Sequence, residues 1–341
     1  TVGDTVAILY DSDNHTVNFY KNNADQGQIT GISNTFEYVP WVYLDNYGTA
    51  PNVHFNFGQR AFAYTPPTGA KKLNSNNIPV DATPSIIRPQ RHFDTLTYTG
   101  NGSSSHRITG LEFQPDLVWI KGRSAGTNHI IQDVVRGNFI LYPDSNQQEG
   151  ATGGGWVKSF NSDGFTTDTN GPINTNNATY VAWCWKAGGA ASSNSDGTIT
   201  SSLSANQEAG CSIITWTGTG SAGTIGHGLG VVPKMIMVKR VSASGNNWTV
   251  YHASLGNTHR LELNSTSAST SDGGAWNNAS PTSTVFYTGN NLTVGHNGST
   301  YIAYCFAEKV GYSKIGSYVG NGNADGTFVY TGFKPSWLMI K

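Results

Sequence analysis

The residues in this chain whose types and spacing could do chemistry are two close pairs of aspartates. Asp11 is followed by Asp13, and Asp163 is followed by Asp168. Two carboxylates roughly 5–10 Å apart could hydrolyse a glycosidic bond. Both pairs lie among Asn, Ser, Thr and Gly, where Asp commonly hydrogen-bonds to its own backbone and forms a turn. The pattern therefore favours turns, and we predict no catalytic residues.

A metal or cofactor site is the next possibility. The segment Asp11-Ser-Asp13-Asn14 has the clustered oxygen ligands that calcium prefers, but it lacks the distal Glu of a calcium loop, so a polar turn is favoured. The nine histidines have no His-x-x-x-His spacing, and there is no Cys-x-x-Cys. Neither a Gly-x-Ser-x-Gly elbow nor a Gly-rich phosphate loop is found. We expect no metal, no cofactor and no enzyme.

Aromatic residues in polar loops remain as candidates for ligand contact. Trp156 and Trp276 both follow Gly-containing stretches, Gly154-Gly155 and Gly274-Ala275. A recurring Trp commonly anchors a loop by packing, whereas an exposed Trp can stack on a sugar, and exposure decides between the two interpretations. The polar neighbours that could complete a glycan contact are Asn161, Asp163, Asn277 and Asn278.

The composition indicates the elements that position these residues. Only 12% of residues are charged and 37% are hydrophobic, so Ser, Thr, Asn and Gly supply the polar surface. These residues are neutral or poor helix formers that favour turns and strand edges, which predicts β structure. The net charge is −1 without a Lys/Arg run, which argues against a nucleic-acid partner. No apolar stretch approaches 18 residues, so no membrane span is expected.

An internal repeat organises the chain. Three segments share one spacing, in which 15 residues separate a Gly from a Pro and 6 separate that Pro from a Lys. The first two copies also end on a strand-like Tyr-x-Ala-aromatic-Cys-aromatic pattern, which predicts buried free thiols at Cys184 and Cys305. The three segments run from Gly100 through Pro115 to Lys121, from Gly218 through Pro233 to Lys239, and from Gly320 through Pro335 to Lys341.

Short apolar runs within each copy are bounded by Gly, Asn, Ser, Asp and Pro, which is typical of a β-sandwich. Both alternating faces are apolar in Leu117–Ile120, so this strand is either central in a two-layer core or covered on its outer face by a partner. The residues before the repeats differ, and the runs 3–11 and 16–22 predict a hairpin around a polar turn.

These patterns divide the chain into units of an all-β protein, a series of concanavalin- or jelly-roll-like sandwiches. Pro-containing residues before the first copy predict a stiff linker, and Ala, Ser, Gly and Asn after it predict a softer one. The predicted units are an N-terminal region at 1–80, a linker at 81–92, repeats at 93–187 and 211–308 separated by a linker at 188–210, and the start of a third repeat at 309–341.

The N-terminal region resembles the C-terminal half of a SPRY domain. The resemblance is carried by Gly3-Asp4 with Asp11, by the segment 17–22, by 56–59 and by 62–69 followed by Leu73-Asn74. It implies a concanavalin-like sandwich. Because the first half of the domain and most of the third repeat are missing, we expect both ends of the sequence to be truncated.

Residues 93–341 resemble a repeated β-domain of predicted tail-fibre and structural proteins of marine phages. The segments that carry this resemblance are 110–123, 133–137, 163–165, 194–199, 226–230 and 301–304. It implies a virion appendage, extracellular or on the virion, that presents loops to host-surface glycan or protein beside other virion proteins. Since several strands are apolar on both faces, we also expect a homo-oligomer, preferably a trimer. The alternatives are a fibre-borne polysaccharide depolymerase and a bacterial surface adhesin.

Overall fold

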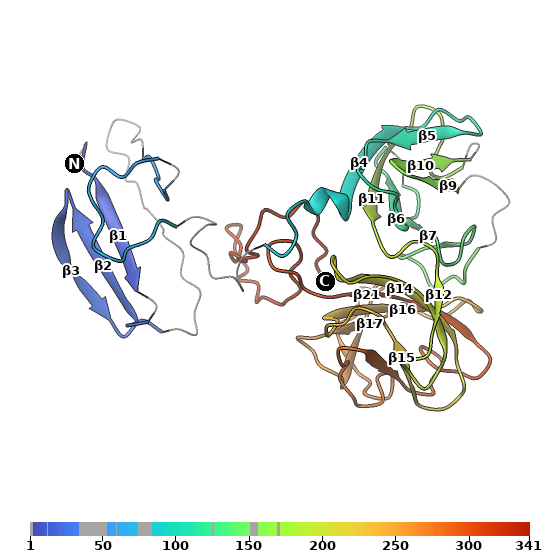
Figure 1. The fold of residues 1–341 in the computed structure, drawn as a ribbon. Coiled ribbons are helices and arrows are strands. Elements are labelled where there is room, and N and C mark those ends of the chain that lie inside the picture. The colour runs from blue at the N-terminus through green and yellow to red at the C-terminus, as the bar shows by residue number, and fades with distance from the viewer. Residues whose placement is uncertain are drawn as a thin grey trace. The chain divides into compact units, whose positions relative to one another are not determined.

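The chain is all-β, as its composition predicts (Figure 1). The computed structural model describes residues 3–11, 13–33, 53–58, 60–73, 84–124, 126–150, 156–168 and 171–341. Two compact units, Thr1–Thr83 and Pro84–Lys341, are described separately below. Within the described residues, no helix has the length and apolar character needed to cross a membrane.

The first unit contains a three-stranded antiparallel sheet of β1 (Val6–Asp11), β2 (Thr16–Lys21) and β3 (Ala24–Thr30). The predicted hairpin is confirmed, with Asp11 opposite Thr16. Its turn is closed by the Asp11 carboxylate, which accepts hydrogen bonds from the backbone N–H groups of Asp13 and Asn14 at 3.0 Å each. The turn interpretation of this segment is therefore confirmed. Residues 34–52 and 74–83 lie outside the described residues. They include part of the SPRY-like region and part of the linker expected at 81–92.

The first repeat is a two-layer sandwich. Its larger sheet has the order β4-β11-β6-β7-β8 and its smaller sheet the order β5-β10-β9. Side chains alternate along a strand, so one face of the larger sheet buries Val118, Ile120 and Ala182 against Ile108 and Phe165 of the smaller one. The strands are β4 (Phe93–Thr99), β5 (His106–Thr109), β6 (Leu117–Gly122), β7 (Ile130–Asp133), β8 (Ile140–Leu141), β9 (Val157–Asn161), β10 (Gly164–Thr167) and β11 (Thr179–Trp185).

The second repeat has an equivalent arrangement, because β14-β21-β16-β17-β18 follows the order of β4-β11-β6-β7-β8. Its smaller sheet pairs β15 (Gly223–Gly226) with β20 (Val285–Thr288). Two further strands extend the larger sheet, β12 (Ser192–Asn194) and β13 (Ser201–Asn206). Residues 188–210, expected as a linker, therefore contain the edge strand β12 and its neighbour β13. The others are β14 (Cys211–Thr217), β16 (Met235–Arg240), β17 (Thr249–His252), β18 (His259–Glu262), β19 (Thr270–Ser271) and β21 (Thr300–Phe306).

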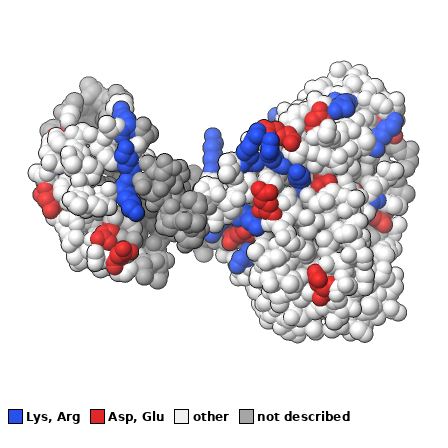
Figure 2. Space-filling view, viewed as in Figure 1, with Lys and Arg blue, Asp and Glu red and all other residues white. Residues whose placement is uncertain are grey.

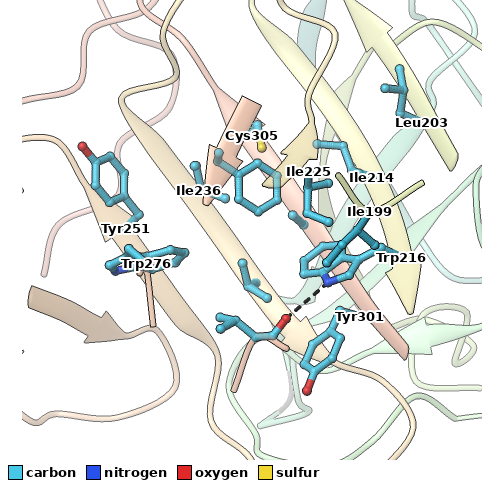
Figure 3. Close-up of a cluster of buried hydrophobic side chains, with 14 of the residues drawn as sticks. Ile199, Leu203, Ile214, Trp216, Ile225, Ile236, Tyr251, Trp276, Tyr301 and Cys305 are labelled. Atoms are coloured by element: carbon cyan, nitrogen blue, oxygen red, sulfur yellow. Dashed lines mark hydrogen bonds between the residues drawn. The ribbon is translucent and has the colours of Figure 1, made fainter. Parts of the chain in front are cut away.

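The core of the second repeat combines aromatic side chains with Ile, Leu, Val and Ala (Figure 3). Trp216 stacks on Tyr301 with 5.3 Å between ring centroids, and its indole N–H donates to the carbonyl of Val294 at 3.2 Å (dashed line in Figure 3). The predicted buried free thiols are confirmed for Cys184 and Cys305, and Cys211 is a third. Burial raises the pKa of all three thiols, so they remain protonated and unreactive near neutral pH.

The two larger sheets pack against each other through the faces that point away from their own cores. Leu117 and Trp119 of β6 share one apolar cluster with Met235 and Met237 of β16 and with Tyr304 of β21. The apolar outer face predicted for the strand at Leu117–Ile120 therefore has a partner, and this partner is the other repeat of the same chain. The apolar character of both faces of this strand suggested a homo-oligomer, but contacts within one molecule account for it.

Candidate glycan-binding site

The structure corrects the expectation for Trp276. Its indole is 1% exposed, its N–H donates to the carbonyl of His259 at 3.0 Å, and its ring packs edge-on against Tyr251 (Figure 3). A buried ring that is bonded in this way cannot stack on a sugar. Asn277 and Asn278 follow it with φ angles of 50° and 52°, in the left-handed region that Asn tolerates, so they form the turn after the anchor.

The candidate contact residues of the first repeat, Trp156, Asn161 and Asp163, make their contacts within that repeat and lie outside the core that contains Trp276. Trp156 is half-buried and packs against the core of the first repeat, whereas Trp276 belongs to the core of the second. Asn161 donates to the hydroxyl of Thr166 at 2.8 Å. The carboxylate of Asp163 accepts from Arg107 at 2.6 Å. Gly154 and Gly155 lie outside the described residues. The contacts were predicted as one set in each repeat, and the polar side chains of the first set bond to residues of that repeat.

A cavity of about 450 Å³ lies where the two repeats and the C-terminal residues meet. Its first wall comes from the outer face of the first repeat's larger sheet. Trp119 on β6 and Trp183 on β11 are direct cross-strand partners, so both side chains lie on the same face. Their ring centroids are 6.2 Å apart and their planes are nearly perpendicular, at 89°. Two rigid strands therefore fix the positions of both indoles.

His129 holds this pair of indoles in place. It stacks on Trp183 at 6.3 Å, and its Nδ1 accepts the indole N–H of Trp119 at 2.9 Å. Its own backbone N–H donates to the Asp144 carboxylate at 3.0 Å. Burial lowers the pKa of His129, although the negative charge of Asp144 opposes the shift. The acceptor role of Nδ1 requires the neutral imidazole, in agreement with the direction of this pKa shift.

The remaining walls come from two other parts of the chain. Leu263, Asn264, Ser265 and Thr266 contribute from the second repeat, and residues 337–340 contribute from the C-terminal region. Trp337 lies 6.5 Å from Trp119 between ring centroids. The ammonium group of Lys341 donates to the carbonyl of Ser265, which ties the C-terminal residues to the second repeat.

The lining combines three indoles, one imidazole, one amide, two hydroxyl groups and one carboxylate with the side chains of Pro143, Leu263, Leu338, Met339 and Ile340. Aromatic faces bind the apolar faces of sugars, and the polar groups can bond to their hydroxyl groups. Asp144 is the one carboxylate that the described residues place in the lining. Among the described residues, no three His, Cys, Asp or Glu side chains gather as a metal site.

The sequence patterns place Trp119 and Trp183 on apolar strands and do not indicate that they contact a ligand. A signal was present, because Met237 and Tyr304 occupy the equivalent positions of the second repeat. The first repeat has two tryptophans opposite each other where the second repeat has other residues. This difference indicates a feature that is specific to the first repeat and is not part of the shared core. The alignment of the two repeats alone could not show that this face lines a cavity.

Residues 88–341 match one protein-family model, described as a domain of unknown function (DUF7483). A search of curated proteins and a search of solved structures found no match.

Proposed function

The chain belongs to the DUF7483 family, since residues 88–341 match its model, and we propose that this region is a non-enzymatic module that binds surface glycans. The observation that carries the proposal is the aromatic cavity between the repeats, in which the partly exposed Trp183 of β11 is held against the buried Trp119 of β6. Ligand sites commonly lie between domains, in clefts lined by aromatic side chains with a few polar groups. Sites built on strands also hold their geometry better than sites on loops.

The resemblance to phage fibre domains supports a proposal about where the module is located and which particle carries it. We propose a structural or adhesive part of a tail fibre or another virion appendage, outside the cell, in contact with a host surface. The surface in view carries scattered charged groups among many uncharged residues (Figure 2), which suits a neutral polysaccharide. A bacterial adhesin with the same domains would bind in the same way and would differ in its owner.

The test is glycan binding by purified protein, measured on an array of bacterial surface polysaccharides. Trp183→Ala should weaken binding by roughly 30-fold, corresponding to about 2 kcal/mol for a central aromatic contact. Phe139→Ala is the matched control, because Phe139 is an exposed aromatic residue of the same repeat that does not line the cavity. Equal binding by the wild type and Trp183→Ala, with both proteins folded, would contradict the proposal. Release of sugars from a bound polysaccharide would favour the depolymerase instead.

A further inference from the structure

An arginine at the end of a central strand of the second repeat has no partner. Arg240 is the last residue of β16 and lies directly opposite Tyr301 of β21. It is half-buried, its Nε is buried without a hydrogen-bond partner, and its guanidinium forms no ion pair with the residues that the structure describes. Five other arginines of the same unit do pair with carboxylates, namely Arg88, Arg91, Arg107, Arg136 and Arg260.

The tyrosine beside Arg240 does not compensate its charge. A guanidinium is not deprotonated in proteins, so Arg240 stays positive. The Tyr301 hydroxyl donates to the carbonyl of Leu292 at 3.0 Å and accepts the backbone N–H of His296 at 3.0 Å. Burial raises the pKa of Tyr301, although the positive charge of Arg240 opposes the shift. The phenol is therefore neutral near pH 7 and offers no negative charge.

A second unpartnered polar group lies on the same face of the sheet. Val238 packs in the core of the second repeat, and side chains alternate along a strand, so Arg240 lies on the core side as well. Thr249 of β17 is opposite Val238, which makes it a diagonal neighbour of Arg240. It is fully buried, and its hydroxyl has no hydrogen-bond partner among the described residues. Two donors on one face therefore lack an acceptor.

The fold of a repeat does not require this polar pair. The equivalent positions of the first repeat are Gly122, at the end of β6, and Ile130, at the start of β7. Neither of these side chains has a hydrogen-bonding group, yet the strands of the two larger sheets follow the same order. A buried donor that lacks an acceptor destabilises a protein. Arg240 and Thr249 are therefore better explained by a bound acceptor than by packing.

We propose that Arg240 and Thr249 bind an oxyanion, a carboxylate, sulfate or phosphate group, with Arg240 as its counter-ion and the Thr249 hydroxyl as a second donor. The planar guanidinium can donate two parallel N–H bonds to such a group, which an ammonium cannot do. Neither residue lines the aromatic cavity, so this site is separate from the proposed glycan contact and does not depend on it. A free anion and an acidic substituent of a polysaccharide share this chemistry.

The first experiment titrates the full chain with sodium sulfate, balanced with sodium chloride to constant ionic strength, and follows the midpoint of thermal unfolding. An anion that binds only the folded chain raises this midpoint in a saturable way. Sulfate also stabilises proteins without a specific site, and Arg240→Gln measures this background. We expect sulfate to bind the wild type more tightly than Arg240→Gln by roughly tenfold or more. Arg107→Gln is the matched control and should bind like the wild type, because Arg107 already pairs with Asp163 at 2.6 Å.

The hydroxyl of Thr249 and the source of the anion are tested in the same way. Thr249→Val keeps the shape of the side chain without its hydroxyl and should weaken sulfate binding by roughly threefold or more. Arg240→Lys, which keeps the charge without the planar fork, should also bind sulfate more weakly and serves if Arg240→Gln does not fold. Tighter binding of a glucuronic acid oligosaccharide than of glucuronate would assign the site to a polysaccharide, and equal or weaker binding to a free anion. An equal rise of the midpoint in the wild type and in both Arg240 variants would mean that water alone occupies the site and would overturn the proposal.

Discussion

At the scale of single residues, the protonation state of His129 should make ligand binding in the cavity depend on pH. Its Nδ1 accepts the Trp119 indole N–H, and protonation of this nitrogen removes the bond. Lys121 and Asp144 are the charged groups that act on it, and burial lowers its pKa below the usual value of about 6.5. We therefore expect glycan binding to be constant above that pH and to fall as the pH drops through the lowered pKa. Titration of binding between about pH 5 and pH 8 measures this, and His129→Gln should flatten the profile.

His227 predicts an acid dependence of stability. It is buried, its Nδ1 accepts from the Leu229 N–H at 3.2 Å, and its Nε2 lies 3.1 Å from the Thr282 carbonyl. Burial lowers its pKa, so the unfolded chain takes up the proton first. Stability is therefore full above about pH 6.5 and is lost as the pH falls through the folded-state pKa. Urea unfolding across this range should show a smaller acid-side loss in His227→Gln, and identical pH profiles would refute the assignment.

Several residue-scale expectations could be made from sequence because they depend on nearby residues. The Asp11 turn closes within three positions, and the Asn14 side chain with the neighbouring N–H groups lowers the pKa of that carboxyl. Whether a tryptophan is exposed depends on distant segments. Trp276 is buried by Tyr251 and the carbonyl of His259, and Trp119 borders a cavity formed with the second repeat, so their sequence contexts could not distinguish an anchor from a ligand contact.

At the scale of elements, a buried polar cluster joins the two repeats. Asp133 is fully buried at the end of β7 and binds Arg136 at 2.6 Å, and the hydroxyl of Tyr304 on β21 donates to it at 2.7 Å. Burial alone would lower the pKa of Arg136, but Asp133 raises it overall, so the guanidinium stays charged. Glu149 lies 3.5 Å from the same guanidinium.

This cluster predicts unequal effects of its two substitutions. Asp133→Ala leaves the charge of Arg136 buried with weaker compensation, so it should lower the free energy of unfolding by about 3–5 kcal/mol. Tyr304→Phe removes one hydrogen bond and should cost about 1 kcal/mol. Equilibrium unfolding in urea measures both values. Equal small losses would mean that the pair contributes little to the contact between the repeats.

The elements that sequence predicts best are the large apolar strands. Leu117–Ile120 was expected to be buried on both faces, and it is, but the pattern could not name the covering partner. Residues 188–210 were expected as a linker because Ser, Ala and Asn dominate them. β12 forms there as the edge strand of the larger sheet, and β13 lies between β12 and β14 with its serines Ser201 and Ser204 buried. Small polar residues therefore concealed two strands.

At the scale of the whole molecule, Pro84–Lys341 should fold without the preceding residues. It is a separate compact unit with three apolar clusters, and the family match begins at residue 88. A domain with its own core can fold alone. We expect a protein of residues 84–341 to unfold in urea with the same midpoint as that unit in the full chain. A molten or aggregated product would show that the first unit is needed for folding.

The first unit has an exposed apolar face that favours self-association of the full chain. Along β1, Val6, Ile8 and Tyr10 alternate on one face and are 64%, 51% and 48% exposed. Ile8 lies opposite Phe19 on β2, which extends this apolar face across the sheet. A second copy covering the face would remove it from water, so we expect an oligomer, preferably a trimer, of the full chain. Light scattering at micromolar concentration should report a larger mass for the full chain than for Ile8→Lys, because the lysine introduces a charge into the buried face. A full chain that is monomeric at that concentration would exclude this assembly and leave the packing between the two repeats as the contact that covers the outer faces of the larger sheets.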